Sequence, residues 1–137
     1  MNAAEIALKL GAAKNLYVGI LLITTRKAAS FRRTNPALQS NESLLFHATD
    51  NPNLLAYSKS TPDFSNTILV IVNLDPYNQQ SGWTDLDLPR LGLVPGTDFY
   101  VEDLLNAASY TWHGRRNYVV LRPGIQAAHL FRVTRVP

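Results

Sequence analysis

The residues most able to do chemistry are few, and their spacing matches no common catalytic motif. The three histidines, His47, His113 and His129, are far apart and do not share the spacing of metal ligands. The chain has no cysteine, which excludes a thiol nucleophile and any cysteine-ligated metal site. It also lacks a His-Glu-x-x-His zinc motif, a Gly-x-Ser-x-Gly elbow and a phosphate-binding loop. We therefore expect no catalytic residue, no bound metal and no cofactor.

Structural roles account better for the individual histidines and carboxylates. His129 has apolar neighbours in a strand-like stretch and is interpreted as a buried histidine bonded to the backbone, whereas His113 is expected to be exposed in a turn. Glycosidic chemistry needs two acids on opposite sides of a sugar. Asp85 and Asp87 would lie about 7 Å apart on one face of a strand. Their alternation with leucine indicates an ordinary solvated face.

The aromatic residues form the candidate binding site. Trp83 and Tyr77 bracket a polar loop, and Trp112 and Tyr118 fall on a predicted hairpin together with Arg115. Flat rings beside polar side chains suit a carbohydrate, because the rings stack on its apolar faces while hydroxyl groups are hydrogen-bonded. The alternative is that both tryptophans belong to the core or cover a neighbouring domain, since aromatic residues dominate cores and interfaces.

Length and composition favour one globular domain. The chain has 137 residues, of which 46% are hydrophobic and 17% charged. Residues 1–40 carry six basic side chains and one acidic side chain, whereas 41–137 carry seven basic and nine acidic side chains. The slightly acidic body argues against a nucleic-acid partner. The longest apolar stretch, Leu16–Ile23, is too short for a membrane span. We therefore expect no membrane partner and a cytoplasmic location.

The elements that must position these residues fall into two unlike parts. Residues 1–40 form an N-terminal helical or irregular segment, in which Ala3–Lys14 is rich in helix formers. Residues 41–137 are predicted to form a mainly β domain, an antiparallel β-sandwich of about eight strands. Thr67–Leu74 is almost wholly apolar and should lie in its middle, buried on both faces. The predicted strands are Ser43–Ala48, Leu54–Lys59, Thr67–Leu74, Thr84–Leu88, Phe99–Leu105, Ser109–Trp112, Arg116–Leu121 and Ala127–Val133.

A series of short motifs follows in order along residues 31–133. The first is the stretch Phe31-Arg32-Arg33-Thr34-Asn35-Pro36-Ala37-Leu38-Gln39. The others are Leu45–Asn51, Leu55–Lys59, Val72–Pro76, Gly82–Leu88, Asp103–Leu105, Tyr110–Trp112, Gly114–Val119 and Ala128–Val133. The first stretch looks like the end of the last barrel helix in enzymes of the α-amylase superfamily. The others are similar to one family within it, the α-1,4-glucan:maltose-1-phosphate maltosyltransferases, members of glycoside hydrolase family 13.

This resemblance implies the C-terminal β-sandwich domain of an enzyme that transfers maltosyl units from maltose 1-phosphate to an α-glucan. The catalytic carboxylates of that family sit on a (β/α)₈ barrel, which alone takes about 250 residues. None can be carried over to this chain, so we expect it to be inactive by itself and to be a truncated or fragment form. Residues 1–40 would be the remnant of the barrel's end. Ala107 stands where a turn glycine is expected.

The expected partner is a catalytic barrel domain or a homologous subunit, with α-glucan as a further ligand. Two other functions fit the same residues. One is a stand-alone α-glucan-binding module, and the other is a subunit that completes a separately encoded barrel in trans. The glucan-binding module would use Trp83, Trp112 and Tyr118 as stacking platforms.

Overall fold

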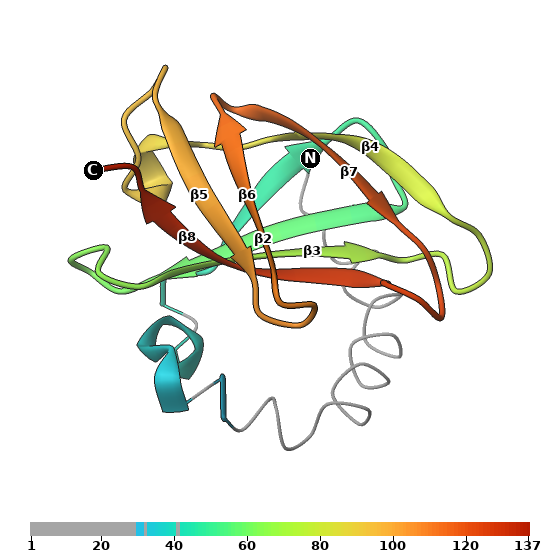
Figure 1. Cartoon of the computed structure of the whole chain (residues 1–137), viewed down its shortest axis with the longest axis horizontal. Coiled ribbons are helices and arrows are strands. Elements are labelled where there is room, and N and C mark those ends of the chain that lie inside the picture. Colours follow the sequence, from blue (N-terminus) through green and yellow to red (C-terminus); the bar gives the residue numbers. More distant parts are fainter. Residues whose placement is uncertain (1–29, 32, 41) are drawn as a thin grey trace.

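The computed structural model describes residues 30, 31, 33–40 and 42–137. The predicted helix Ala3–Lys14 and most of the N-terminal segment lie outside the described residues. The described residues form eight strands and two short 3₁₀ turns, one before the first strand and one between the fourth and the fifth. Figure 1 shows their arrangement. The strands are β1 Leu45–Thr49, β2 Leu54–Ser60, β3 Thr67–Asn73, β4 Gln80–Asp85, β5 Asp98–Asp103, β6 Ala108–His113, β7 Arg116–Leu121 and β8 Ala128–Arg135, with 3₁₀ turns η1 Pro36–Gln39 and η2 Pro89–Leu91.

All eight strands belong to one antiparallel sheet that folds over on itself. Its order is β6-β5-β8-β3-β2-β1-β4-β7. The sheet bends within β1, which pairs with β2 through Leu45–His47 and with β4 through Ala48 and Thr49. One strand therefore serves two layers, and an apolar interior is enclosed between them. The predicted mainly β, antiparallel architecture is confirmed.

The interior between the layers is filled by alternate residues of the strands. Phe99, Leu121 and Leu69 are fully buried there. Leu86, Leu88, Leu91 and Leu93, from the segment that leads through η2, close one side of this core. The partly buried Trp112 packs against the same cluster. The core is continuous, as expected for a chain long enough to bury its own apolar surface.

The predicted hairpin of Ser109–Trp112 with Arg116–Leu121 is wrong. β6 pairs with β5, whereas β7 pairs with β4, so the two strands joined by the Gly114 turn do not pair with each other. Gly114 has a φ of 65°, which a tight turn needs whether it returns to the same layer or crosses to the other. Turn chemistry alone could not distinguish these two connections.

The strand predicted over Thr84–Leu88 is displaced towards the N-terminus. β4 covers Gln80–Asp85, and the chain leaves the sheet before Leu88, whose φ of −60° and ψ of −44° are helical. Pro89 follows as the first residue of η2, where its fixed φ and missing N–H are tolerated. Leu86 and Leu88 are still buried, so the alternation of leucine with aspartate predicted burial correctly but not strand pairing.

Candidate functional site

The outer side of β3 is as apolar as its inner side. Every residue of Thr67–Asn73 is buried, which confirms the prediction for this strand. A strand in a two-layer sandwich has only one face on the shared core, so burial of the other face requires a third layer. We call this other side the outer face. Its apolar side chains are Ile68, Val70, Val72, Ala128, Tyr57, Leu74, Leu104, Leu105 and Leu130.

The turn η1 lies on the outer face and supplies part of that third layer. Ala37 is buried there, and Leu38 packs against the same cluster. Two asparagines hold η1 in place. The Ala37 N–H donates to Asn66 Oδ1 at 3.0 Å, and Asn66 Nδ2 donates to Asn35 Oδ1 at 3.0 Å. Asn35 is extended, as the residue before a proline prefers, and its side chain is almost fully buried.

The two hydrogen bonds of Asn66, to Ala37 and to Asn35, form a clamp that gives a structural reason for the Asn-Pro-Ala-Leu motif. Asn35 ties the incoming chain to the β2–β3 turn, Pro36 starts η1, and Ala37 is small enough to lie flat on the sheet. The chain therefore enters the sandwich across the outer face. Asn66, which completes the clamp, was not singled out in the sequence, and no local pattern marks it.

Two of the predicted carbohydrate-binding residues are brought together by the structure. Trp83 of β4 and Tyr118 of β7 are direct cross-strand neighbours on the outward side of their layer. Their ring centroids are 5.3 Å apart in an edge-to-face arrangement, and both residues remain about half exposed, at 42% and 51%. The guanidinium carbon of Arg116 lies 5.3 Å from the Trp83 ring centroid, a cation–π distance.

The other predicted residues lie elsewhere. Trp112 packs edge-on against Phe99 and Phe131 of the core, with centroid distances of 6.1 and 5.1 Å, so its role is structural. Tyr77 is 88% exposed in the β3–β4 loop. Arg115 sits in the turn after β6 and pairs with Asp85 at 3.5 Å. The five candidates are thus divided among the core, the β3–β4 loop, the β6–β7 turn and the β4–β7 layer.

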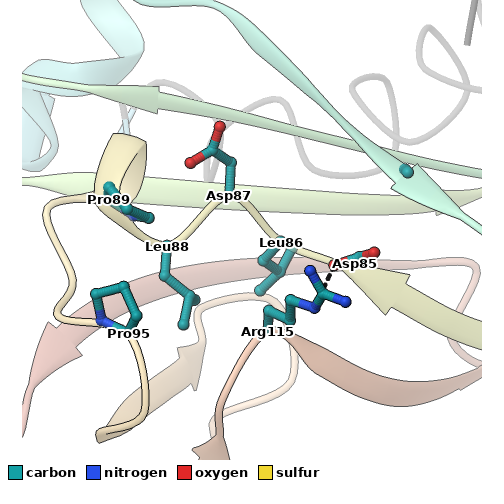
Figure 2. Close-up of a pocket in the computed structure, with 8 residues that line it drawn as sticks. Asp85, Leu86, Asp87, Leu88, Pro89, Pro95 and Arg115 are labelled. Atoms are coloured by element: carbon teal, nitrogen blue, oxygen red, sulfur yellow. Dashed lines mark ion pairs between the residues drawn. The ribbon is translucent and has the colours of Figure 1, made fainter.

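A hollow of about 440 Å³ opens beside the Asp85–Arg115 ion pair. Figure 2 shows this pair on one side of the hollow, Pro89 and Pro95 on the other, and Leu86 and Leu88 between them. The Asp87 carboxylate points away from the two leucines. Because the floor is apolar and the rim carries one charged pair, the hollow suits a small, uncharged ligand with both apolar and hydroxyl surfaces.

His47 supports the segment that lines the hollow. It is 3% exposed, and its Nδ1 accepts the Asp87 N–H at 3.2 Å. With Nδ1 acting as the acceptor, Nε2 carries the proton and donates to Ser58 Oγ at 2.8 Å. Burial lowers the pKa of His47 from 6.5 to about 4, with a smaller opposing effect of Asp87 and a further lowering by Arg90. The imidazole therefore stays neutral at neutral pH and links β1, β2 and the segment before η2.

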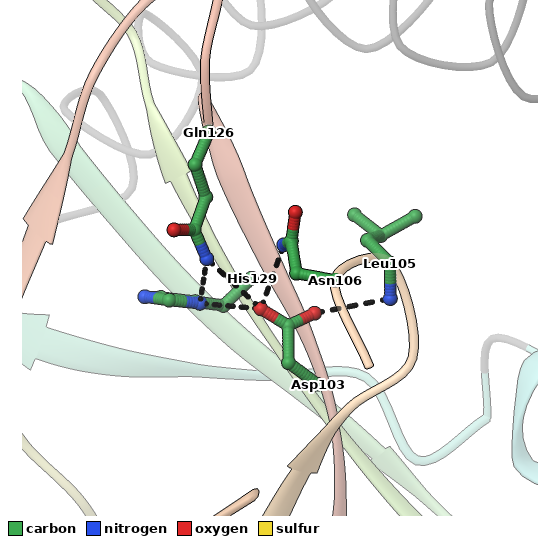
Figure 3. A network of polar contacts seen from close by, with 5 residues as sticks. All are labelled: Asp103, Leu105, Asn106, Gln126 and His129. Atoms are coloured by element: carbon green, nitrogen blue, oxygen red, sulfur yellow. Dashed lines mark hydrogen bonds and ion pairs between the residues drawn. The ribbon is translucent and has the colours of Figure 1, made fainter. Parts of the chain in front are cut away.

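Among the described residues, Asp103 and His129 form the most buried contact between a carboxylate and an imidazole. His129 Nδ1 lies 2.8 Å from Asp103 Oδ2, and the Asp103 side chain is fully buried. Leu105, Asn106 and Gln126 also donate to this carboxylate, as Figure 3 shows. Burial raises the pKa of Asp103, but the hydrogen bonds from His129, Asn106 and Leu105 outweigh it and lower the pKa below its usual value.

The Asp103 contact corrects the prediction for His129. The imidazole is buried in β8 as expected, but its partner is a carboxylate instead of the backbone. It stacks on Phe131 with a centroid distance of 4.5 Å, so the pair joins β5 to β8 at the end of the core. Nothing in the spacing of Asp103 and His129, 26 residues apart, could have paired them.

Ala107 keeps the turn in which a glycine was expected. Its φ is 52°, in the left-handed region that residues with a Cβ atom adopt at a cost. The turn after β5 closes nonetheless, since β5 and β6 pair in register from Asp103 and Ala108 onwards. Alanine at this position therefore strains the turn between β5 and β6 without disrupting their pairing.

The described residues hold neither a cluster of metal ligands nor a membrane-spanning helix. Within residues 30–31, 33–40 and 42–137, no group of three His, Cys, Asp or Glu side chains is placed to hold a metal ion. In the same described part of the chain, no helix has the length and apolarity needed to cross a bilayer.

Comparison with known proteins identifies the domain. A family model described as "GLGE, C-terminal" matches residues 46–133. An α-1,4-glucan:maltose-1-phosphate maltosyltransferase 1 of Streptomyces coelicolor is 46% identical over 106 residues, which cover 77% of this chain and 15% of that protein. A maltosyltransferase of the same name from Methylacidiphilum infernorum is 39% identical over 108 residues, covering 79% and 16%. The chain thus spans about one-sixth of the length of these relatives.

Among solved structures, the maltogenic α-amylase AmyB of Thermotoga neapolitana is similar with a TM-score of 0.58 and 16% identity. The match covers 82% of this chain and 24% of that one, and at this identity it shows the fold alone. The match of the family model extends from β1 into β8 and thus takes in most of the sandwich. The chain belongs to the family of C-terminal domains described by that model, whose full-length relatives here are maltosyltransferases.

Proposed function

We propose that residues 41–137 are the non-catalytic C-terminal domain of a maltosyltransferase, packed against a (β/α)₈ catalytic barrel that they stabilise. Residues 1–40 would be the end of that barrel domain, and the enzyme would work in the cytoplasm. The names of the relatives supply the reaction, the transfer of maltosyl from maltose 1-phosphate to an α-1,4-glucan. The proposal is that this chain contributes structure to the reaction and no reacting group.

The single observation that carries the proposal is the apolar outer face. A sheet with one solvated side alternates apolar and polar residues, but Ile68, Val70 and Val72 make the outer side of β3 wholly apolar. The chain enters across this same face through η1. Because the family match is to the C-terminal part of longer enzymes, the domain that precedes it would approach from that side. Ile68, Val70 and Val72 are already buried within this chain, so the barrel would pack on the half-buried apolar residues of the outer face around them, which are Leu74, Leu104, Leu105 and Leu130.

Two neighbouring loops would extend this contact at one end of the molecule. Leu74 and Ala128, both on the outer face, lead into the β3–β4 and β7–β8 loops. Arg122 Nε donates to Gln79 Oε1 at 2.8 Å and joins the two loops, which lie at the same end of the sandwich in Figure 1. The highly exposed Tyr77 is on the first loop. Its ring would bury a large apolar area on docking, so we assign Tyr77 to this interface and not to sugar binding.

The test is co-expression of the chain with the Streptomyces coelicolor enzyme from which the matching 106 residues have been removed. Purification through a tag on the present chain should recover the truncated enzyme. A charge on the outer face, Leu130→Lys, should reduce the recovered amount at least tenfold. Val120→Lys is the matched control, because it is a similarly half-buried strand residue on the outward side of the other layer.

Each variant is checked for the β-sheet circular dichroism of the wild type. Equal recovery with folded Leu130→Lys would contradict docking through the outer face. Failure of the wild-type chain to recover the truncated enzyme would contradict the function as a whole. Recovery also decides whether the chain acts in trans as a separate subunit.

A further inference from the structure

We propose that the outward side of the β4–β7 layer binds a segment of α-1,4-glucan, with Trp83 and Tyr118 as the stacking surface and the Asp85–Arg115 hollow as the polar end. The identity of the glucan rests on the proposed function, whereas the existence of a neutral sugar site rests on the geometry. We call Trp83, Tyr118 and Arg116 the aromatic surface.

The aromatic surface is fixed in position before any ligand arrives. The backbone N–H of Trp83 donates to Asp50 Oδ1 at 2.8 Å, and its backbone carbonyl accepts the Asp50 N–H at 3.1 Å, so the main chain at this position is fixed. The Tyr118 ring and the Arg116 guanidinium contact the Trp83 indole from two directions. Because the indole is already held by these neighbours, stacking a ligand on it costs little side-chain freedom.

The hollow begins one step along the same strand. Trp83 and Asp85 are alternate residues of β4 and therefore point outward about 7 Å apart. Asp85 lies opposite Arg116 in the register of β4 with β7 and forms an ion pair with Arg115 from the turn. One short oligosaccharide can thus rest on the rings and reach the carboxylate and guanidinium groups. These groups offer both acceptors and donors for its hydroxyl groups.

The charges around the site favour a neutral ligand. Asp85, Asp87 and Asp50 are balanced by Arg115, Arg116 and Arg90, so neither sign dominates. A phosphate or a nucleic acid would require an excess of positive charge. A pyranose chain has apolar ring faces for the aromatic surface and hydroxyl groups for the rim, which is the combination that both parts of the site can satisfy.

The position of the site in the sandwich keeps it available in an assembled enzyme. β4 and β7 form one layer, and β3 and β8 belong to the other. The aromatic surface faces away from its own layer's core and thus away from the outer face proposed to meet the barrel. A glucan held here would be attached to the enzyme at a point separate from the docking surface.

The test is titration of the purified chain with maltoheptaose, with cellohexaose as a β-linked comparison. The Trp112→Phe variant leaves Trp83 as the only tryptophan, so its fluorescence reports on the site. We expect a saturable change with maltoheptaose at millimolar concentration and at least tenfold weaker binding when calorimetry is repeated with Trp83→Ala or Tyr118→Ala. Tyr77→Ala, which removes an exposed ring from another loop, should bind like the wild type.

Each outcome bears on the inference separately from the proposed function. Saturable binding of maltoheptaose that is lost in Trp83→Ala supports it. No binding by the folded wild-type chain, or binding unchanged in both Trp83→Ala and Tyr118→Ala, overturns it. Equal binding of both sugars keeps the sugar site but refutes its assignment to α-linked glucan. None of these results affects recovery of the truncated enzyme through the outer face, which tests docking alone.

Discussion

Replacing His47 by glutamine should remove most of the sensitivity of the fold to mild acid. His47 is buried and neutral, and its pKa in the folded chain is about 4 against 6.5 for an exposed imidazole. Between pH 6.5 and pH 4 the imidazole of His47 binds a proton in the unfolded chain but not in the folded chain. The free energy of unfolding therefore falls as the pH falls. The stabilisation is complete above the unfolded pKa and is lost progressively towards pH 4.

The size of the effect follows from the two pKa values. Lowering the pH from about 7.5 to about 5 should reduce the free energy of unfolding by about 2 kcal/mol through this one residue. In His47→Gln the amide can still accept the Asp87 N–H and donate to Ser58, as the imidazole does. The variant has no titratable group at position 47. The same fall in pH should therefore reduce its free energy of unfolding by about 2 kcal/mol less than it reduces that of the wild type.

Urea unfolding at the two pH values, followed by tryptophan fluorescence, measures the difference. His113→Gln is the control, because it removes an exposed histidine and leaves His47 in place. It should retain the loss of stability seen in the wild type. The reasoning fails if His47→Gln loses as much stability between the two pH values as the wild type does.

Three further substitutions test the interior and the turns by the same unfolding assay. Asp103→Asn should lower the free energy of unfolding by about 3 kcal/mol because it replaces a buried carboxylate that accepts hydrogen bonds from Leu105, Asn106, Gln126 and His129. The exposed Asp98→Asn should stay within about 1 kcal/mol, and equal effects would refute the importance assigned to burial. Ala107→Gly should raise stability by about 0.5–1 kcal/mol by relieving a φ of 52°, and a loss would show that the corner is unstrained. Gly82→Ala should cost about 2 kcal/mol through crowding, since its Cβ would lie 2.6 Å from Asp50 Oδ1; an unchanged midpoint would contradict that packing.

The parts of the fold that could be predicted are those in which one residue pattern has one structural outcome. The run Thr67–Leu74 is almost wholly apolar, and only a strand covered on both sides can bury it, as β3 does over Thr67–Asn73. Asn35-Pro36 ends the preceding segment because the residue before proline is driven into extended geometry. These features are local, and the sequence determines them.

The parts that could not be predicted depend on contacts between distant residues. Gly114 marks a turn, but the layer to which β7 returns is decided by its pairing with β4. Trp83 and Tyr118, which the sequence assigns to different elements, become neighbours through the β4–β7 pairing. Trp112 instead packs against Phe99 and Phe131 of the core. Pairing and packing across the sandwich thus selected which aromatic residues remained at the surface.

Phosphate release from maltose 1-phosphate in the presence of a glucan tests the central claim most directly. The purified chain alone should release none, and addition of the chain to the truncated Streptomyces coelicolor enzyme should raise the release above that of the truncated enzyme by itself. Release by the chain alone would contradict its assignment as a non-catalytic domain. Release by the truncated enzyme that is unaffected by the chain would contradict a stabilising role.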